Sequence, residues 1–415
     1  MDNGLRVNLL PDSSLPLVAV NLWYHVGSRH ESPGRTGLAH LFEHMLFEGS
    51  AHVPGNDHFR LIQQVGGSAN GSTWYDRTNY YETVPAHCLE LALWLEADRM
   101  GFLLPALTPE KLAIQQQVVL NERRERIDNQ PYGLALERLF AGLYPDSHPY
   151  GWPVIGTPED IAAATLDDVR KFFQTWYTPD NAVLTLVGDF GADAALSLVE
   201  RWFADIPSRD TPHTNTNRPP DAPIRLNGPM DEVMGDRVEL ERCYIGFRLP
   251  PYGTPDWYAA DLLAAVLATG KASRLYKDLV HDRKMAHQVS ASTLPTELGG
   301  SFLVVATASD DDGASALVER VQAHLGDVAR GEVSAAAVER ARSQVLSGYV
   351  ESLQTLEERA DEISQFTTFL DRPDALHDEF TTYSRIQPED LVRVAQRWLA
   401  PADAVILRVV PEERL

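Results

Sequence analysis

The sequence has little of what several protein classes require. Among its 415 residues are only two cysteines, Cys88 and Cys243, which lie far apart and lack the spacing of metal ligands. We therefore expect inert buried thiols rather than a disulfide framework. Basic residues are also few: 36 Lys and Arg stand against 59 Asp and Glu, which gives a net charge of −23. Because no basic patch is available to neutralise phosphates, nucleic acid is not an expected partner.

Long apolar runs are missing as well. No stretch reaches the ~18 residues that a membrane span needs, although 44% of the residues are hydrophobic. That proportion over a chain of this length can build two or more cores. Residues 3–7 read as a first strand rather than as a signal peptide. We expect a soluble protein without a membrane span; its location stays open between the cytoplasm and, if an export signal has been removed, the periplasm.

The most informative stretch is His40-Leu41-Phe42-Glu43-His44. It lies in a run without helix breakers directly after Pro33-Gly34-Arg35-Thr36-Gly37, which predicts a helix that begins there. Positions four apart share one face of a helix, so His40 and His44 can offer two imidazoles to one ion, with Glu43 on the adjoining face. Two neutral nitrogen ligands and a carboxylate are the parts of a zinc hydrolase site, and the order H-x-x-E-H is the inverted zincin signature.

The surroundings of this motif argue against a solvent-exposed cluster of polar residues. Apolar residues flank the two His and the Glu on nearly every side of the predicted helix: Leu38, Ala39, Leu41, Phe42, Met45, Leu46 and Phe47. A helix that is apolar almost all round is buried, and buried ionisable groups need partners or a metal. The pattern therefore favours a metal site.

A catalytic zinc usually takes a third protein ligand and leaves one position for water. Candidates lie in the charged run 118–126, which continues a helical pattern that begins near Thr108-Pro109-Glu110. These three residues supply a helix N-cap, a proline and an acidic first turn. Glu122 and Glu125 both qualify chemically, and sequence spacing alone does not choose between them.

The chain also contains an internal duplication. Residues 168–183 can be laid over residues 390–405 without a gap, and Asp, Gln, Trp, Pro, Ala and Val coincide. Both copies end a helix at a Trp, turn at a Pro and enter an apolar strand. The economical interpretation is two similar domains. We expect an N-terminal domain over 1–205, a linker over 206–236, where Pro, Asn, Thr, Asp and Gly accumulate, and a C-terminal domain over 237–415.

Each half alternates β-rich runs with helical stretches. The predicted strands lie near 5–10, 17–26, 69–73, 78–84 and 183–189 in the first half, and near 238–248, 288–292, 302–307 and 405–409 in the second. This order predicts an α+β fold in which each domain has a largely antiparallel or mixed sheet with helices packed on one face. The helical stretch 257–269, which corresponds to the metal-motif helix, holds no His. We therefore expect the second domain to bind substrate rather than metal.

At this point the chain resembles a known family. Residues 27–45 resemble the pitrilysin/insulinase family of zinc metallopeptidases, closest to the branch of short subunits that includes the mitochondrial processing peptidase, and the likeness runs nearly end to end. Further similar segments are Ala69-Asn70-Gly71-Ser72-Thr73, Thr78-Asn79-Tyr80-Tyr81, Glu96-Ala97-Asp98-Arg99-Met100, His148-Pro149-Tyr150 and Ile155-Gly156-Thr157.

The resemblance implies one Zn²⁺ per chain, held by His40, His44 and a distal Glu. The 77 residues between His44 and Glu122 match the family's spacing, which favours Glu122 over Glu125. Glu43 would then be the general base that activates a zinc-bound water. One departure is Gln115, which stands where some members carry a supporting Glu, so the support of the ligands differs there.

The resemblance also implies how substrate is held. Asn70, Gly71 and Ser72 correspond to an edge strand to which an extended peptide adds as a further strand. Arg342 and Tyr349, seven apart on one face of a predicted helix, match an Arg and Tyr that reach the substrate and the tetrahedral intermediate in the family. Guanidinium and phenol are both hydrogen-bond donors, which suits an oxyanion.

Taken with these residues, the resemblance implies an endopeptidase that cleaves unfolded or precursor peptides inside a clamshell chamber. Longer relatives build that chamber from four such domains, so this two-domain chain is expected to dimerise. A homodimer is favoured because one chain carries both halves of the site, and a heterodimer is the other arrangement. The alternative function is a catalytically silent partner or scaffold subunit, which the complete metal motif disfavours.

Overall fold

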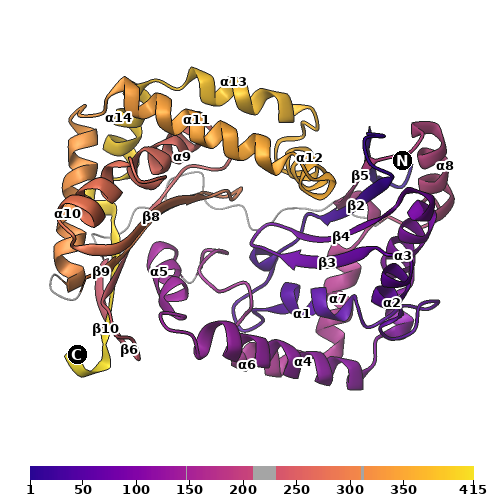
Figure 1. Ribbon diagram of the computed structural model, residues 1–415. Helices are drawn as coiled ribbons and strands as arrows, with labels where there is room; N and C mark the ends of the chain where they lie inside the picture. Colours follow the sequence, from indigo (N-terminus) through magenta and orange to yellow (C-terminus); the bar gives the residue numbers. More distant parts are fainter. Residues whose placement is uncertain (146, 209–229, 310–312) are drawn as a thin grey trace. The chain divides into compact units, whose positions relative to one another are not determined.

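The computed structural model describes residues 1–145, 147–208, 230–309 and 313–415, and the chain forms two compact units (Figure 1). Unit 1 contains Met1–Arg123, the described residues of 152–208, and Ser352–Leu376. Unit 2 contains Arg124–Gly151, residues 230–351 except the undescribed ones, and His377–Leu415. Each unit is built on one five-stranded sheet. The α+β class with two similar domains is thus confirmed.

The sheet of unit 1 has the strand order β1-β5-β2-β4-β3. Its strands are β1 (Arg6–Pro11), β2 (Leu17–Tyr24), β3 (Ser68–Thr73), β4 (Thr78–Pro85) and β5 (Ala182–Gly188). Strands β1 and β5 run parallel, and the other neighbours are antiparallel. All five strands lie within two residues of the predicted positions. The arrangement leaves β3 at one edge, where its outer backbone groups can pair with another strand.

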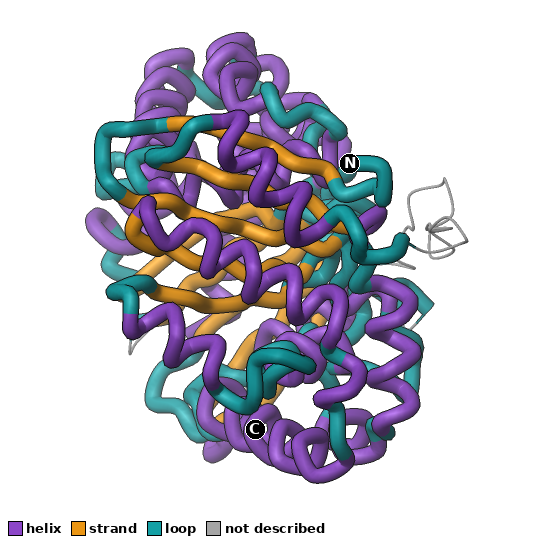
Figure 2. Tube along the Cα trace, turned by 90° about the vertical axis from the view of Figure 1, so that its right-hand side faces the viewer, coloured by secondary structure: helices purple, strands orange, loops and turns teal. Residues whose placement is uncertain are grey.

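Helices cover both faces of this sheet. They are α1 (Leu38–Met45), α2 (Asp57–Gln64), α3 (Leu89–Phe102), α4 (Pro109–Arg123), α6 (Pro158–Ala163), α7 (Leu166–Trp176), α8 (Ala192–Phe203) and α12 (Leu356–Leu370). Short helical turns are η1 (Ser28–His30), η2 (Ala86–Cys88), η3 (Leu104–Ala106) and η5 (Pro179–Asn181). Figure 2 shows helices lying across the strands.

The alternation of side chains along β2 explains the two covered faces. Val18, Val20 and Leu22 join the main core of unit 1, with residues of α1, α3 and α7. Ala19 points to the opposite face from Val18 and Val20, and it packs against α12. Because successive strand residues point to opposite faces, the continuous burial along β2 requires a layer on each side of the sheet.

Helix α12 comes from the second half of the sequence and crosses the sheet of the first. Leu356, Ala360 and Ile363 pack in the apolar cluster on this face. Between them, Asp361 Oδ1 accepts hydrogen bonds from Asn21 Nδ2 at 3.0 Å and Trp23 Nε1 at 2.8 Å. The prediction of helices on one face therefore needs an addition in unit 1, where α12 covers the second face of the sheet. The apolar pattern of a helix does not indicate which sheet it will cover.

The sheet of unit 2 repeats the topology, with the order β6-β10-β7-β9-β8. Its strands are β6 (Met230–Asp236), β7 (Arg242–Arg248), β8 (Ala286–Leu294), β9 (Ser301–Ala308) and β10 (Val405–Pro411). The first and last strands are again the parallel pair. The duplication is also visible locally, because both a helix ending at Trp176 and one ending at Trp398 lead through a proline turn into the last strand.

The predicted linker over 206–236 is wrong in its last part. Residues 230–236 form strand β6, which pairs in parallel with β10. This strand is acidic, has no buried residue and lies at the edge of the sheet, so it lacks the apolar alternation that marks a strand in the sequence. The middle of the predicted linker, 209–229, lies outside the described residues.

The helices of unit 2 are α5 (Ala135–Leu143), α9 (Pro255–Ala268), α10 (Gly313–Ala329), α11 (Ala335–Ser352), α13 (Asp378–Arg385) and α14 (Pro388–Trp398). Shorter segments are η4 (Arg124–Asp128), η6 (Tyr276–Asp282), η7 (Ala375–His377), η8 (Pro401–Asp403) and η9 (Glu412–Arg414). Helix α5 comes from the first half of the sequence and packs on β7 and β10, so the two halves contribute one helix to each other's sheet.

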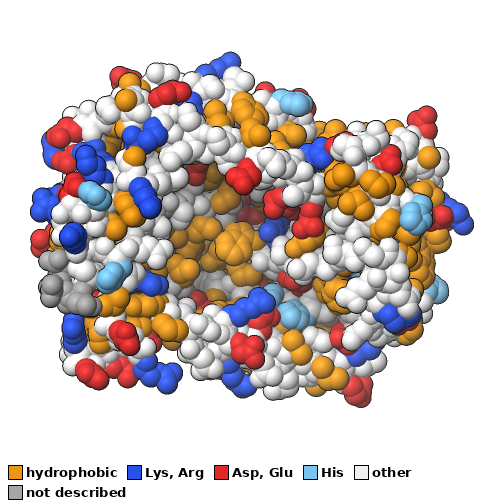
Figure 3. Space-filling model, viewed as in Figure 1, with side chains coloured by type: hydrophobic (Ala, Val, Ile, Leu, Met, Phe, Trp, Pro, Cys, Tyr) orange, Lys and Arg blue, Asp and Glu red, His pale blue; other side chains and the backbone are white. Residues whose placement is uncertain are grey.

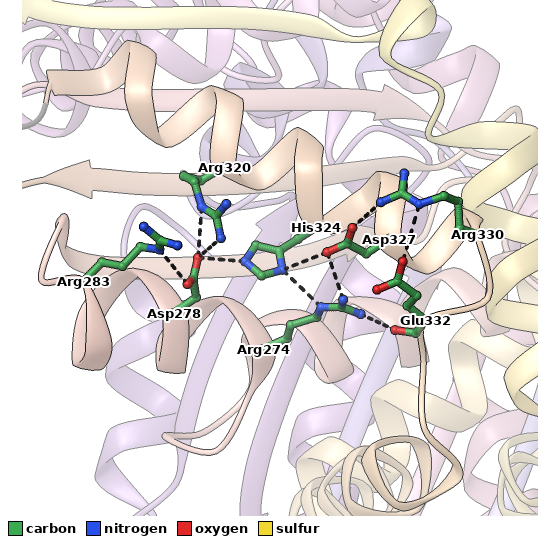
Figure 4. A network of polar contacts seen from close by, with 8 residues as sticks. All are labelled: Arg274, Asp278, Arg283, Arg320, His324, Asp327, Arg330 and Glu332. Atoms are coloured by element: carbon green, nitrogen blue, oxygen red, sulfur yellow. Dashed lines mark hydrogen bonds and ion pairs between the residues drawn. The ribbon is translucent and has the colours of Figure 1, made fainter.

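A polar network ties the π-helical segment η6 to α10 in unit 2 (Figure 4). Asp278 of η6 accepts hydrogen bonds from Arg320 at 2.6 Å and Arg283 at 2.9 Å, and it lies 2.9 Å from His324 Nε2. These partners hold the pKa of Asp278 well below its usual range. The network thus adds polar contacts to the apolar packing of Leu279, which anchors η6 in the core of unit 2.

Both cysteines are free thiols; Cys243 is buried as expected, whereas Cys88 is only half-buried. Burial raises the pKa of Cys243 to about 12, so its thiol stays protonated. None of the helices in the described part of the chain has the length and apolarity to cross a membrane. Acidic and basic side chains are interspersed on the face shown in Figure 3.

Candidate metal centre

The helix that carries the metal motif begins at a tight contact between two glycines. Gly37, the N-cap of α1, has φ +83°, and Gly156 has φ +80°. A Cβ on Gly37 would lie 2.6 Å from the carbonyl oxygen of Ile155, and one on Gly156 would lie 2.5 Å from Gly37 Cα. Only glycine satisfies both the left-handed conformation and this approach. The loop at 155–157 therefore fixes where α1 starts.

The carboxylate of Glu31 caps the same helix end. Its Oε2 accepts a hydrogen bond from the backbone N–H of Gly37 at 2.9 Å, and its Oε1 accepts one from Ala39 at 2.7 Å. Glycine has no side chain for capping, so these first N–H groups are satisfied by Glu31, six positions before the N-cap. An anionic group here also suits the positive end of the helix dipole.

Helix α1 presents its apolar residues to the core and its motif residues to a half-buried surface. Leu41, Phe42 and Met45 are fully buried, as the apolar surroundings of the motif predict. Phe42 packs against Tyr177, with ring centroids 4.3 Å apart. The side chains of His40 and His44 are 13% and 23% exposed, which leaves them accessible to an ion.

The structure brings His40, His44 and Glu122 together. Glu122 Oε2, near the end of α4, lies 3.2 Å from His44 Nε2 and 3.8 Å from His40 Nε2. One ligand atom from each of the three residues lies within 4.8 Å of the others. Bonds of about 2.0–2.2 Å at a tetrahedral centre place ligand atoms roughly 3.3–3.6 Å apart. The donor set and its spacing therefore fit Zn²⁺.

The alternative ligand Glu125 does not join this group. It is exposed on η4, beyond the end of α4. Gln115, two turns before Glu122, is nearly buried and donates a hydrogen bond from Nε2 to Glu48 Oε1 at 2.6 Å. This bond links α4 to the segment that follows α1. Gln115, the predicted departure from the family pattern, thus makes a structural contact between α4 and the chain just after α1.

Glu43 lies beside the ligands, on the face of α1 that looks toward β3. Its Oε2 accepts a hydrogen bond from Thr73 Oγ1 at 2.5 Å. Burial raises the pKa of Glu43, and the Thr73 hydroxyl, His44 and Arg77 oppose this by favouring the charged form. A carboxylate whose pKa is raised is a stronger base and is suited to take up a proton.

The three residues predicted to bind substrate lie on the edge strand β3. Asn70 is exposed, and its Oδ1 accepts a hydrogen bond from the N–H of Gly71 at 2.9 Å. Ser72 Oγ lies 2.6 Å from Asn79 Oδ1 of the neighbouring strand, to which it donates a hydrogen bond. A Cβ on Gly71 would approach Phe47 Cε2 to 3.2 Å, so a glycine lets β3 lie close to the segment after α1.

A second group of potential ligands in unit 1 is organised around an arginine. His58 Nε2 lies 2.6 Å from Glu82 Oε1, and Glu96 Oε2 accepts a hydrogen bond from Arg99 Nε at 2.8 Å. All four side chains are buried. Burial lowers the pKa of His58 to about 3, which keeps it neutral. Because Arg99 supplies the positive charge, this group is a structural ion pair rather than a metal site.

Arg342 and Tyr349 both lie on α11 of unit 2. Arg342 Nε donates to the carbonyl oxygen of Tyr383 at 3.0 Å, and its Nη2 donates to that of Ile386 at 2.6 Å. These bonds satisfy carbonyl groups at the C-terminal end of α13. The ring of Tyr349 packs edge-on against Phe380. The donor role of Arg342 and Tyr349 in catalysis stays a prediction.

Sequence reasoning missed two residues that shape the metal centre. Thr73 was part of a recognised segment, but only the structure places its hydroxyl on Glu43. Glu31 likewise lies in the segment that resembles the family, and its contact with α1 spans six residues of irregular chain. The sequence signal for Glu31 is a glycine at the predicted N-cap, because that helix start needs a capping group from elsewhere.

Two family profiles match this chain. The profile described as Insulinase (Peptidase family M16) matches residues 6–156, and the one described as Peptidase M16 inactive domain matches residues 163–345. The first match contains the His40, His44 and Glu122 group. The second contains α9, which occupies the place of α1 in the repeated topology and carries no His.

Similar proteins agree with these matches. The zinc protease PqqE of Helicobacter pylori is 29% identical over 419 residues, which cover 99% of this chain and 92% of that protein. The crystal structure of a protease from Helicobacter pylori has a TM-score of 0.92 and 28% identity, covering 99% and 98% of the two chains. The periplasmic protease PqqL from Escherichia coli shares the fold, with a TM-score of 0.79 and 19% identity, over 47% of its chain.

Proposed function

This chain belongs to the insulinase family, peptidase family M16, and on that premise we propose that it is a zinc-dependent endopeptidase. Its substrates are unfolded peptides or precursor peptides. The single observation that supports this most is the convergence of His40, His44 and Glu122 on one point, with Glu43 beside them. The spacing of His40 and His44 on α1 does not by itself bring a carboxylate to that point, whereas the packing of α4 does so with Glu122.

His40 and His44 would bind the ion through their Nε2 atoms, and Glu122 through a carboxylate oxygen. Bound Zn²⁺ would lower the pKa of a coordinated water and polarise the scissile carbonyl. The protein's own part is to fix these ligands: the glycine contact and Glu31 set the start of α1, and Gln115 links α4 to the following segment.

Glu43 is the general base in this proposal. Its carboxylate takes a proton from the attacking water and then returns it to the leaving amine. Burial supports this role because it raises the pKa of Glu43, which makes the carboxylate a stronger base than a solvent-exposed one. The Thr73 hydroxyl, His44 and Arg77 oppose the shift, because they favour the charged form of the carboxylate.

Strand β3 is the proposed substrate-binding element. It stands at the sheet edge next to β4, and an extended peptide can pair with its outer backbone groups. Asn70, Gly71 and Ser72 lie on the part of this strand that precedes Thr73. Backbone pairing recognises chain conformation more than side chains, so it selects for unfolded segments.

A dimer is the proposed working form. The chain matches 47% of the PqqL chain, so two chains supply the length of that protein. In a homodimer, Arg342 and Tyr349 of one subunit would donate hydrogen bonds to the oxyanion at the other subunit's metal centre. Arg342 would then give up one of its hydrogen bonds to the carbonyl groups of Tyr383 and Ile386 and donate to the substrate instead. Pairing with a different chain is the second arrangement.

The experiment compares the wild type with Glu43→Gln and the control Glu125→Gln. Glu43→Gln should keep about one zinc per chain, because it alters no ligand, and should lose cleavage of an unstructured peptide by roughly 10²–10⁴-fold. Glu125→Gln should keep both properties. Normal cleavage by Glu43→Gln would refute the general-base assignment. If no variant cleaves, including the wild type with zinc, the silent-partner function is supported instead.

Subunit mixing tests the shared site. Chains carrying Glu43→Gln or Arg342→Ala should each be inactive alone as homodimers. After mixing and exchange, half of the dimers are mixed and each contains one complete site, so activity should return to about a quarter of the wild-type value. No recovery after exchange has been verified would contradict a site shared across a dimer.

A further inference from the structure

Glu43 is held by a residue outside its own helix. Thr73 is the last residue of β3, and its Oγ1 lies 2.5 Å from Glu43 Oε2. Thr73 is 9% exposed, so little water competes for this bond. A hydroxyl has a single hydrogen to donate, and an ionised carboxylate is a stronger acceptor than a neutral oxygen. The hydrogen of Thr73 is therefore given to Glu43.

The neighbouring Thr78 is the other hydroxyl close to Thr73. Thr78 faces Thr73 in the register of β3 and β4. Its own hydroxyl donates to the carbonyl oxygen of Val26 at 2.8 Å and lies 3.5 Å from Thr73 Oγ1. Glu43 Oε2, at 2.5 Å, is much nearer to Thr73 Oγ1 than Thr78 Oγ1 is, so Glu43 is the better acceptor for the Thr73 hydrogen. The two threonines thus have different partners although they lie side by side.

The position of β3 makes this contact possible. Alternate residues of a strand share a face, so Gly71 and Thr73 point to the same side, toward α1 and Phe47. Glycine at 71 allows the strand to approach closely, since a Cβ would meet Phe47 Cε2 at 3.2 Å. Ser72 points to the other side, where Arg77 Nη1 donates to its carbonyl oxygen at 2.9 Å. The hairpin is therefore held from both faces.

We propose that Thr73 is a positioning residue for catalysis, which fixes the Glu43 carboxylate through Oε2 and leaves Oε1 to take the proton. This rests on the proposed peptidase function. Thr73 also stands on the strand that would pair with substrate.

The test uses Thr73→Val, which removes the hydroxyl at nearly constant volume, and Thr73→Ser, which keeps it. For cleavage of an unstructured fluorogenic peptide, Thr73→Val should lower kcat roughly 10–100-fold, because a misdirected catalytic group reacts poorly. Its KM should stay within about 2-fold and its zinc content near that of the wild type, because no ligand changes. Thr73→Ser should restore most of kcat.

Thr78→Val is the matched control. It removes a hydroxyl at the facing position, which does not contact Glu43. It should lower the melting temperature, because the Val26 carbonyl loses its donor, while kcat stays within about 2-fold of the wild type. If Thr73→Val fails to fold, as judged by its melting curve and zinc content, Thr73→Ala replaces it. Thr73→Ala should then show the loss of kcat, and Thr73→Ser should retain most of it.

Two results would overturn the proposal: unchanged kcat in Thr73→Val, or a loss that lies entirely in KM. A loss of kcat in Thr73→Ser equal to that in Thr73→Val would also overturn it, because the hydroxyl would then not matter. Failure of the peptidase function itself looks different, since the wild type and Glu43→Gln would then cleave at the same rate.

Discussion

Replacing Glu31 by Gln should destabilise the metal-bearing helix while changing only one atom of the side chain. Both carboxylate oxygens of Glu31 accept backbone hydrogen bonds, from Gly37 at 2.9 Å and Ala39 at 2.7 Å. A glutamine keeps one acceptor oxygen and turns an N–H₂ group toward the other backbone N–H. Two donors then face each other in a site where Glu31 is 3% exposed.

The size of the effect follows from these contacts. One charge-assisted hydrogen bond is lost and one buried donor is left unsatisfied, which costs about 1–3 kcal/mol. The favourable interaction of the carboxylate with the helix dipole contributes up to about 1 kcal/mol more. We expect a loss of roughly 3 kcal/mol in the free energy of unfolding of unit 1. For a unit of this size, that corresponds to a decrease in melting temperature of roughly 6–12 °C.

Calorimetry of the metal-free protein measures this decrease in melting temperature without a contribution from metal binding. Glu159→Gln is the matched control, because Glu159 also lies in the first turn of a helix but is exposed. It should change the free energy of unfolding by less than about 0.5 kcal/mol. A melting temperature of Glu31→Gln equal to that of the control would refute the capping role of Glu31.

Two further predictions concern other parts of the fold. Burial raises the pKa of Glu379 to about 7; its contribution to stability is therefore complete below the unfolded pKa of about 4.3 and is lost as pH rises through 7. Urea unfolding at pH 5 and pH 8 measures this loss. Between these pH values, the free energy of unfolding should fall by roughly 2–3 kcal/mol more in the wild type than in Glu379→Gln. The same pH dependence in both proteins would contradict the prediction. Gly156→Ala should lower stability by at least about 2 kcal/mol, because of its positive φ and the clash with Gly37. Gly191→Ala, with open space around its Cβ position, should change stability by less than about 0.5 kcal/mol, and equal effects of the two would argue against the glycine contact.

Local features of the fold could be predicted from the sequence because they follow from periodicity and turn residues. The helix from Leu166 to Trp176 and the strand from 182 have a capping Thr, a proline turn and an apolar run, all readable in order. Strand β6 could not be recognised, because an exposed acidic edge strand is held by pairing with β10 rather than by its own pattern. The packing of α12 on the first sheet was also hidden, since an amphipathic helix does not encode its partner.

The candidate site divides in the same way. His40 and His44 could be placed on one helix face from their spacing alone. The choice of Glu122 over Glu125 needed the family's spacing, because it depends on how α4 lies against α1. The roles of Thr73 and Glu31 depend on contacts with residues 30 and six positions away in the sequence, which no periodic pattern predicts. Such contacts become visible only when the elements are packed.

The most direct test is the location of zinc in the wild-type protein. After reconstitution with one equivalent of Zn²⁺, crystals should show one anomalous peak at the zinc edge per chain. This peak should lie about 2.0–2.2 Å from the Nε2 atoms of His40 and His44 and from the carboxylate of Glu122. A chain that retains no zinc, or a peak bound elsewhere, for example at Glu125, would contradict the proposed metal centre.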